Sequence, residues 1–243
     1  MFATSARFAL AATALGAVLS VVAPQAAHAG IAPPPGSSTT PQLPGPGDIV
    51  NMHFCNGKIA TIVGTSGIDS IQGTPSDDVI VSLGGNDWVY GNGGNDTICS
   101  GLGDDHVFGE DLTPSLNDGL NTVYGGPGAD YIIGGGGKDV VSGGTGSDYI
   151  LGSDGADTLS GDDDNDTIYG QAGIDYADGG AGSDLLDAAS GDDGSYDMVY
   201  GGADNDVLRT KDGIANDVGD GGTGVNGCRK DLGEAVSNCQ VAL

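Results

Sequence analysis

The sequence predicts an all-β solenoid of stacked nine-residue repeats, and three observations lead to this fold class. In the stretch GGPGADYIIGGGGKDVVSGGTGSDYILGSDGADTLS (125–160) an aspartate recurs at every ninth residue from Asp130 to Asp157. Glycines precede each aspartate, and an aliphatic residue follows it two positions later. Interruptions elsewhere in the chain preserve the phase of the period, as loop insertions in a solenoid do.

The repeat can be followed from residue 64 to residue 229. Three insertions interrupt it, at 109–115, 188–191 and 210–211. Asn121 and Asn226 take the aspartate position in two units, and the other units hold Asp69, Asp78, Asp87, Asp96, Asp105, Asp130, Asp139, Asp148, Asp157, Asp166, Asp175, Asp184, Asp197, Asp206 and Asp217.

Each repeat is expected to form a turn followed by a short strand. The first six residues, rich in glycine and aspartate, would form the turn, where positive φ values let carbonyl oxygens point inward. The last three would form a strand whose middle residue alone faces the core. This pattern weakens only at the C-terminal end, and the core positions hold Ile71, Ile80, Val89, Ile98, Val107, Val123, Ile132, Val141, Ile150, Leu159, Ile168, Ala177, Leu186, Val199, Leu208, Gly219 and Cys228.

Two units, GNGGNDTIC (91–99) and GGTGSDYIL (143–151), resemble the GGxGxDxUx nonapeptide of haemolysin-type, or RTX, calcium-binding proteins. The resemblance covers residues 64–229. It implies a right-handed parallel β-roll with two nonapeptide units per coil and calcium ions between stacked turns. Weaker turn geometry is expected where the fourth-position glycine is replaced, at Ser76, Asp164, Ser195, Asp204 and Ala215.

Stacking of alternate units would arrange the aspartates in two ladders. Neighbouring carboxylates about 4.8 Å apart would repel by about 3 to 4 kcal/mol at an effective dielectric constant near 20, so a hard cation would have to lie between them. Asn121 and Asn226 would offer an uncharged amide oxygen. One ladder holds Asp69, Asp87, Asp105, Asp130, Asp148, Asp166, Asp184 and Asp206; the other holds Asp78, Asp96, Asp139, Asp157, Asp175, Asp197 and Asp217.

Calcium is the cation that fits best, and we expect several ions per chain. Calcium accepts carboxylate and carbonyl oxygens in loose geometry, whereas magnesium demands a tight octahedron. Zinc lacks its usual histidine and cysteine ligands. The alternative is an acidic face that is merely solvated, but such a face would tolerate drift in the spacing of its charges.

The strongly acidic composition limits the kinds of partner that the protein can bind. The chain has 34 acidic residues against 7 basic ones and a formal charge of −27, which excludes nucleic-acid binding. With 5% aromatic residues it would be disordered if the repeat did not organise it.

Residues 1–29 are predicted to be a cleaved secretory signal. Arg7 precedes an apolar run at 8–23, and Ala27-His28-Ala29 supplies the small residues that a signal peptidase reads. The run is short for a membrane span, and the alternative is a retained N-terminal anchor. A Pro/Gly/Ser linker at 30–47 is expected to be disordered, and the mature chain is expected to be secreted and extracellular, with no membrane span.

Residues 48–63 and 230–243 are expected to cap the two ends of the roll. Four cysteines in a secreted chain suggest two disulfides, with three alternative connectivities. We favour Cys55 with Cys99 and Cys228 with Cys239. If residues 55–63 formed a leading coil in register, Cys55 would be too distant from Cys99 to bond, and the cap would have to fold back over the sheet.

An enzyme is not expected. The segments outside the repeat are too short for a catalytic pocket, and no constellation of nucleophile, histidine and acid appears. The sequence also has no regular file of threonines for ice binding, and its basic residues are too scattered to grip an anionic polysaccharide.

The outward positions of one sheet form a strip of Trp88, Tyr90, His106, Phe108, Tyr131, Ile133, Tyr149, Leu151 and Tyr169. A strip of this length exceeds the apolar patches of ordinary monomers, so it is predicted to bind a second copy of the roll or a cell-surface glycan, through Trp88, Tyr90, Tyr131 and Tyr149. Alternatively, aromatic residues simply favour strands, or the 109–115 insertion covers the strip.

The sequence therefore predicts a secreted calcium-binding β-roll that folds on calcium and has a structural or surface-interaction role. The alternatives are an accessory module of an adhesion or glycan-binding system, and a repeat domain associated with an enzyme.

Overall fold

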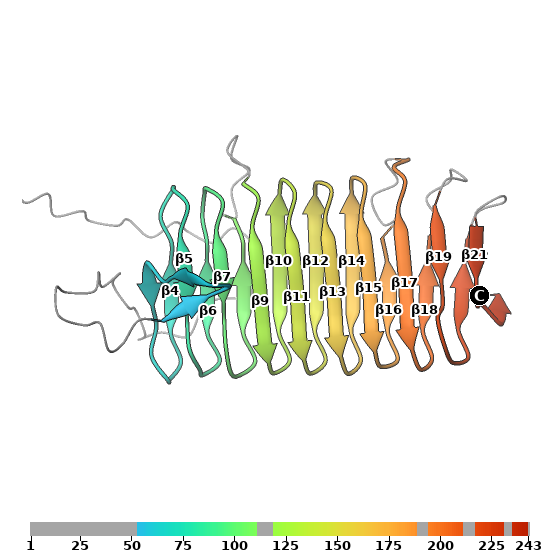
Figure 1. Cartoon of the computed structure of the whole chain (residues 1–243), viewed down its shortest axis with the longest axis horizontal. Helices are drawn as coiled ribbons and strands as arrows, with labels where there is room; N and C mark the ends of the chain where they lie inside the picture. Colours follow the sequence, from blue (N-terminus) through green and yellow to red (C-terminus); the bar gives the residue numbers. More distant parts are fainter. Residues whose placement is uncertain (1–52, 111–118, 189–193, 211–216, 231–234, 243) are drawn as a thin grey trace, which may run out of the picture.

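The computed structural model is a parallel β-solenoid of about eight turns, shown in Figure 1. It describes residues 53–110, 119–188, 194–210, 217–230 and 235–242. These residues contain no helix, and hence none long and apolar enough to cross a membrane. They form two ten-stranded parallel sheets, which we call sheet I and sheet II, and one two-stranded hairpin.

Sheet I contains the even-numbered strands from β4 onward. They are β4 (Ser70–Gln72), β6 (Trp88–Tyr90), β8 (His106–Phe108), β10 (Tyr131–Gly136), β12 (Tyr149–Asp154), β14 (Thr167–Ala172), β16 (Leu185–Asp187), β18 (Val207–Arg209), β20 (Gly227–Arg229) and β22 (Val241–Ala242).

Sheet II contains the odd-numbered strands from β3 onward. They are β3 (Ile62–Val63), β5 (Val79–Val81), β7 (Thr97–Cys99), β9 (Thr122–Pro127), β11 (Val140–Thr145), β13 (Thr158–Asp163), β15 (Tyr176–Ala181), β17 (Met198–Ala203), β19 (Val218–Asp220) and β21 (Ala235–Ser237).

Alternate units stack, as the sequence predicts. Tyr131 of β10 pairs with Tyr149 of β12, eighteen residues and two units further on. The register also continues across the insertions, because His106 pairs with Tyr131 and Tyr176 pairs with Met198. Most of the inserted residues lie outside the described part of the chain, but the strands on either side keep their phase.

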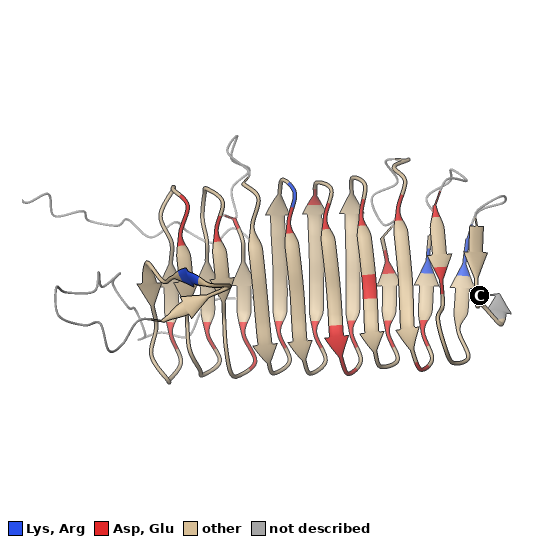
Figure 2. Cartoon of the chain, viewed as in Figure 1, with Lys and Arg blue, Asp and Glu red and all other residues tan. Residues whose placement is uncertain are grey.

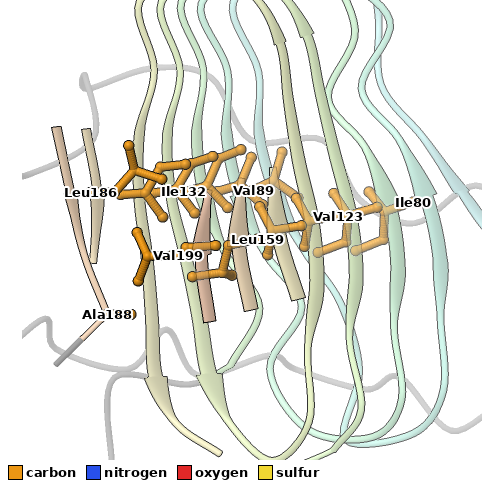
Figure 3. Close-up of a cluster of buried hydrophobic side chains, with 14 of the residues drawn as sticks. Ile80, Val89, Val123, Ile132, Leu159, Leu186, Ala188 and Val199 are labelled. Carbon is orange, nitrogen blue, oxygen red and sulfur yellow. The ribbon is translucent and has the colours of Figure 1, made fainter. Parts of the chain in front are cut away.

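The core consists of two files of aliphatic side chains that meet between the sheets (Figure 3). The predicted core residues from Ile71 to Leu208 are all buried, and Cys228 is 8% exposed. Ile62 at the start of the roll and the partly buried Val236 at its end extend the files by one strand each. Gly219 adds no side chain, which confirms that the core weakens towards the C-terminus.

The central strands are longer than expected. From β9 to β15, and in β17, each strand has six residues and not three, so the expected six-residue turn is wrong for these units. After the core residue the pairing skips one glycine and resumes: Ile133 pairs with Leu151, and Gly135 pairs with Ser153. Gly135 and Ser153 have φ values of 116° and 84°, and this left-handed bend lets the ladder continue past the skipped residue with the same register on both strands.

Replacement of the fourth-position glycine changes the turn at Ser76 and Ser195 but not at Asp164 and Asp204, and Ala215 lies outside the described residues. Asp164 and Asp204 keep positive φ values of 78° and 76°, which aspartate tolerates better than most residues. Ser76 has no positive φ, and neither does Thr74 two residues earlier, so the turn before Asp78 has a different shape.

The N-terminal hairpin resolves the difficulty with the disulfide. Strands β1 (Phe54–Cys55) and β2 (Lys58–Ile59) pair antiparallel and lie across β5 and β7, the cyan hairpin of Figure 1. Cys55 packs there against Val81 and bonds to Cys99. The cap thus folds back over sheet II, and the second predicted pair, Cys228 with Cys239, is also bonded.

Candidate metal centre

The repeat aspartates stand at the end of each turn, immediately before the strand. Figure 2 shows acidic residues in the turns at both ends of the strands. All fifteen predicted ligands and both asparagines are buried, with at most 6% of each residue exposed. A charged residue type that is buried at every repeat needs partners that the hydrophobic core does not supply.

One carboxylate oxygen, Oδ1, links neighbouring coils. The backbone N–H of Asp130 donates to Oδ1 of Asp148 at 2.8 Å, and the N–H of Asp148 donates to Oδ1 of Asp166 at 2.8 Å. The same bond runs through both predicted ladders, from Asp69 to Asp206 in one and from Asp78 to Asp217 in the other. This bond could not be predicted from the sequence, because the period shows where a carboxylate stands and not which atom it contacts.

The other carboxylate oxygen, Oδ2, is left without a donor in the middle of the roll. It is buried and has no hydrogen-bond partner among the described residues in Asp87, Asp96, Asp105, Asp130, Asp148, Asp157, Asp166, Asp184 and Asp206. A buried carboxylate oxygen with neither a hydrogen-bond donor nor a cation beside it lowers the stability of the fold. These oxygens therefore indicate a site that a cation can bind.

A glycine gives most of these oxygens their space, whereas Ser82 and Ser100 hold the corresponding position before Asp87 and Asp105. The point where a Cβ of Gly125 would stand is 2.5 Å from Oδ2 of Asp130 and 2.5 Å from the carbonyl oxygen of Gly143 in the next coil. At Gly201 the corresponding distances are 2.5 Å to Oδ2 of Asp206 and 2.8 Å to the next carbonyl oxygen. A Cβ at these glycines would fill this space, and two oxygens that converge there form a donor set suited to a hard cation.

Burial shifts the titration of these carboxylates. It raises the pKa of Asp130 to about 8, against the opposing effect of the hydrogen bond from Asp105. Burial likewise raises the pKa of Asp166 to about 7 and that of Asp148 and Asp157 to about 6. The charged form is therefore disfavoured until a cation compensates it.

The ligands would come largely from the backbone. Within the described residues, no three His, Cys, Asp or Glu side chains gather in a group that could hold a metal ion. Each turn offers a carboxylate oxygen beside carbonyl oxygens, which suits calcium and does not suit zinc.

Four further units differ from this arrangement in the partners of the ladder residue itself. Oδ2 of Asp69 accepts the backbone N–H and the hydroxyl of Thr65, and Oδ2 of Asp78 accepts the same groups of Thr74. The other two units hold asparagine. That Asn121 offers its amide oxygen to a cation stays a prediction; in the structure this oxygen accepts the N–H of Asp96 at 2.9 Å.

The residue before the aspartate forms an outer set of links that sequence reasoning missed. Oδ1 of Asn95 accepts the N–H of Leu120, and Oδ1 of Asn165 accepts the N–H of Ser183 in the next coil. The signal was available in the sequence, because asparagine or aspartate recurs at this position and both favour such side-chain-to-backbone bonds.

The aromatic strip forms a row of rings on sheet I. Trp88 stacks on His106 with ring centroids 4.4 Å apart, and Tyr131 stacks on Tyr149 at 5.0 Å. Trp88 is only 8% exposed, whereas Tyr149 is 37% exposed, so the strip opens towards the middle of the roll. His106 belongs to this stack, between Trp88 and Tyr131. The insertion proposed to cover the strip lies largely outside the described residues.

Comparison with known protein families agrees with the resemblance. The model described as RTX calcium-binding nonapeptide repeat (4 copies) matches residues 60–87, 72–107, 116–150, 142–177, 160–194 and 195–214. Together these matches cover more than half of the chain. A search of curated proteins finds no match.

Proposed function

Because the chain belongs to the RTX calcium-binding nonapeptide repeat family, we propose that it is a secreted protein whose β-roll folds on binding calcium. Its role in this proposal is structural or in surface interaction. RTX repeats bind calcium ions, and the chain repeats their turn along almost its whole described length.

The observation that supports this function best is the buried Oδ2 that faces a carbonyl oxygen at a glycine. The residues that would hold calcium are the ladder aspartates together with turn carbonyl groups. Support is strongest at the glycine-lined units of Asp96, Asp130, Asp148, Asp157, Asp166, Asp184 and Asp206. Bound calcium would neutralise these carboxylates, and their Oδ1 bonds would then tie successive coils together.

Isothermal titration calorimetry on the decalcified protein tests calcium binding. We expect several calcium ions to bind per chain, and magnesium, the matched control, to give little heat because it keeps its waters. Absence of calcium binding at millimolar concentration, or equal binding of magnesium, would contradict the proposal.

The two disulfides support an extracellular location, because such bonds persist in oxidising compartments. The predicted signal at 1–29 and linker at 30–47 lie outside the described residues. The protein recovered from the culture medium of its producing cells should begin near residue 30, and N-terminal sequencing tests this.

A non-catalytic role fits the family, whose repeat rolls are typically structural. The surface-interaction role is favoured by the open end of the aromatic strip, at Tyr131, Tyr149 and Tyr169, where neighbouring rings lie 5.0 Å and 5.6 Å apart. We propose that this end stacks on a cell-surface glycan, with association of two rolls as the competing outcome.

Changing Tyr131, Tyr149 and Tyr169 to serine tests that role. The matched control changes Tyr176 and Tyr200, a ring pair 5.2 Å apart on sheet II. The first variant should lose calcium-dependent retention on cell-surface material and the control should keep it. Loss of dimers by light scattering in the first variant alone would favour self-association, and unchanged behaviour in both assays would refute a binding role for the strip.

A further inference from the structure

The two asparagines of the ladders have a fixed orientation. Oδ1 of Asn121 accepts the backbone N–H of Asp96 at 2.9 Å, and Oδ1 of Asn226 accepts that of Asp206 at 2.8 Å. A backbone N–H must be paired with an acceptor, so the amide oxygen has to face it. The amide nitrogen therefore stands where an aspartate has Oδ2.

That nitrogen donates to carbonyl groups. Nδ2 of Asn121 donates to the carbonyl oxygen of Gly134 at 3.4 Å, and Nδ2 of Asn226 donates to those of Gly221 and, at 3.3 Å, Asn238. The carbonyl oxygen of Gly134 and Nδ2 of Asn121 both lie beside the point where a Cβ of Gly109 would stand. In the same way, the carbonyl oxygen of Gly143 and Oδ2 of Asp130 lie beside the corresponding point at Gly125. The same niche thus holds a donor and an acceptor at Asn121, but two acceptors at Asp130.

In the first two units, hydrogen-bond donors of a threonine face Oδ2 of the aspartate. Oδ2 of Asp69 lies 2.5 Å from the N of Thr65 and 2.9 Å from its hydroxyl oxygen. In the next unit the distances from Oδ2 of Asp78 to Thr74 are 2.6 Å and 2.8 Å. Neither threonine has a positive φ, and in this conformation its N–H points to the carboxylate of its own turn.

We propose that hydrogen-bond donors of the chain replace calcium at four units, those of Asp69, Asp78, Asn121 and Asn226. This inference rests on the proposed calcium binding and refines where it occurs. Three of the four units stand at the ends of the roll, near the two disulfides. The ends are thus built without calcium, and calcium binds the coils between them.

Exchanging the two residue types at neighbouring units tests the inference. Asn121→Asp places a carboxylate oxygen against the Gly134 carbonyl group, and Asp130→Asn does the reverse within the same region. We expect Asn121→Asp to bind more calcium per chain than the wild type and to retain less β signal in excess chelator. Asp130→Asn should bind less calcium and retain more β signal in excess chelator.

The readouts are the calcium content of the dialysed full chain by elemental analysis and the β signal in excess chelator by circular dichroism. Asn226→Asp, near the end of the roll, is the second variant in case Asn121→Asp does not fold. The inference would be overturned if the calcium content of Asn121→Asp and Asn226→Asp were unchanged or lower than that of the wild type. It would also be overturned if these two variants failed to fold even in saturating calcium. A wild type that binds no calcium would instead overturn the proposed function.

Discussion

Each ladder aspartate uses its two carboxylate oxygens differently. Oδ1 of Asp148 holds the preceding coil through the N–H of Asp130, and Oδ2 faces the niche proposed for calcium. The residue thus contributes both to the stacking of coils and to the charge that calcium neutralises. This dual use explains why one residue type recurs where a merely acidic surface would vary.

The position of an aspartate along the roll should determine the effect of its removal. Asp148 lies between two six-residue strands, β11 and β12. Asp217 lies before β19, a three-residue strand whose core residue is Gly219. We expect Asp148→Ala to cost about 2 kcal/mol through its charged hydrogen bond alone and to raise the calcium midpoint of folding more than Asp217→Ala does. Equal shifts in the calcium midpoint, followed by circular dichroism, would contradict a nearest-neighbour solenoid.

The raised pKa values predict an unusual dependence of stability on pH. Without calcium, the folded chain keeps protons on Asp130 up to about pH 8 and on Asp166 up to about pH 7, whereas the unfolded chain loses them near the ordinary value of 3.8. Folded-state pKa values above the unfolded ones mean that stability falls as pH rises through this window.

We therefore expect the calcium-free protein to show more β signal by circular dichroism at pH 5 than at pH 8. Addition of calcium at pH 7 should release protons, and a pH-stat measures them. A β signal that rises with pH in calcium-free buffer would show that these carboxylates are not buried and uncompensated.

At the scale of the element, glycines in two positions have opposite consequences. A Cβ on Gly219 would lie in the core, 3.3 Å from Cγ1 of Val236 and 3.5 Å from Cγ2 of Thr210, and the residue has no positive φ. A Cβ on Gly125 would instead meet Oδ2 of Asp130 and the Gly143 carbonyl oxygen, both at 2.5 Å.

Val236 is only partly buried, so it has room to move by the few tenths of an ångström that a contact of 3.3 Å requires. Gly219→Ala should therefore stabilise the calcium-loaded roll by about 1 kcal/mol, because it buries a methyl group and restricts the unfolded chain. Gly125→Ala should destabilise it by about 1 to 3 kcal/mol and lower its calcium content. Denaturant unfolding in saturating calcium measures both changes. The same sign for both variants would argue against the niche at Gly125.

At the scale of the whole molecule, the period predicts most of the fold. It gives the phase across insertions, the core from Ile71 to Leu208 and the membership of both ladders, because stacking of identical units leaves few alternatives. It does not reveal the longer central strands, since a left-handed bend at the second glycine leaves no mark on the period. Nor does it distinguish Asp69, satisfied by Thr65, from Asp130, because that difference depends on the shape of one turn.

The central claim is that calcium on the buried aspartates holds the roll together. The most direct measurement is far-ultraviolet circular dichroism of the purified protein at pH 8, titrated with calcium from a chelated start. We expect the β signal to be largely absent in excess chelator and to develop with calcium but not with magnesium, because uncompensated carboxylates and one aliphatic residue per repeat cannot stabilise the coils. A full β signal that persists in excess chelator would contradict the account.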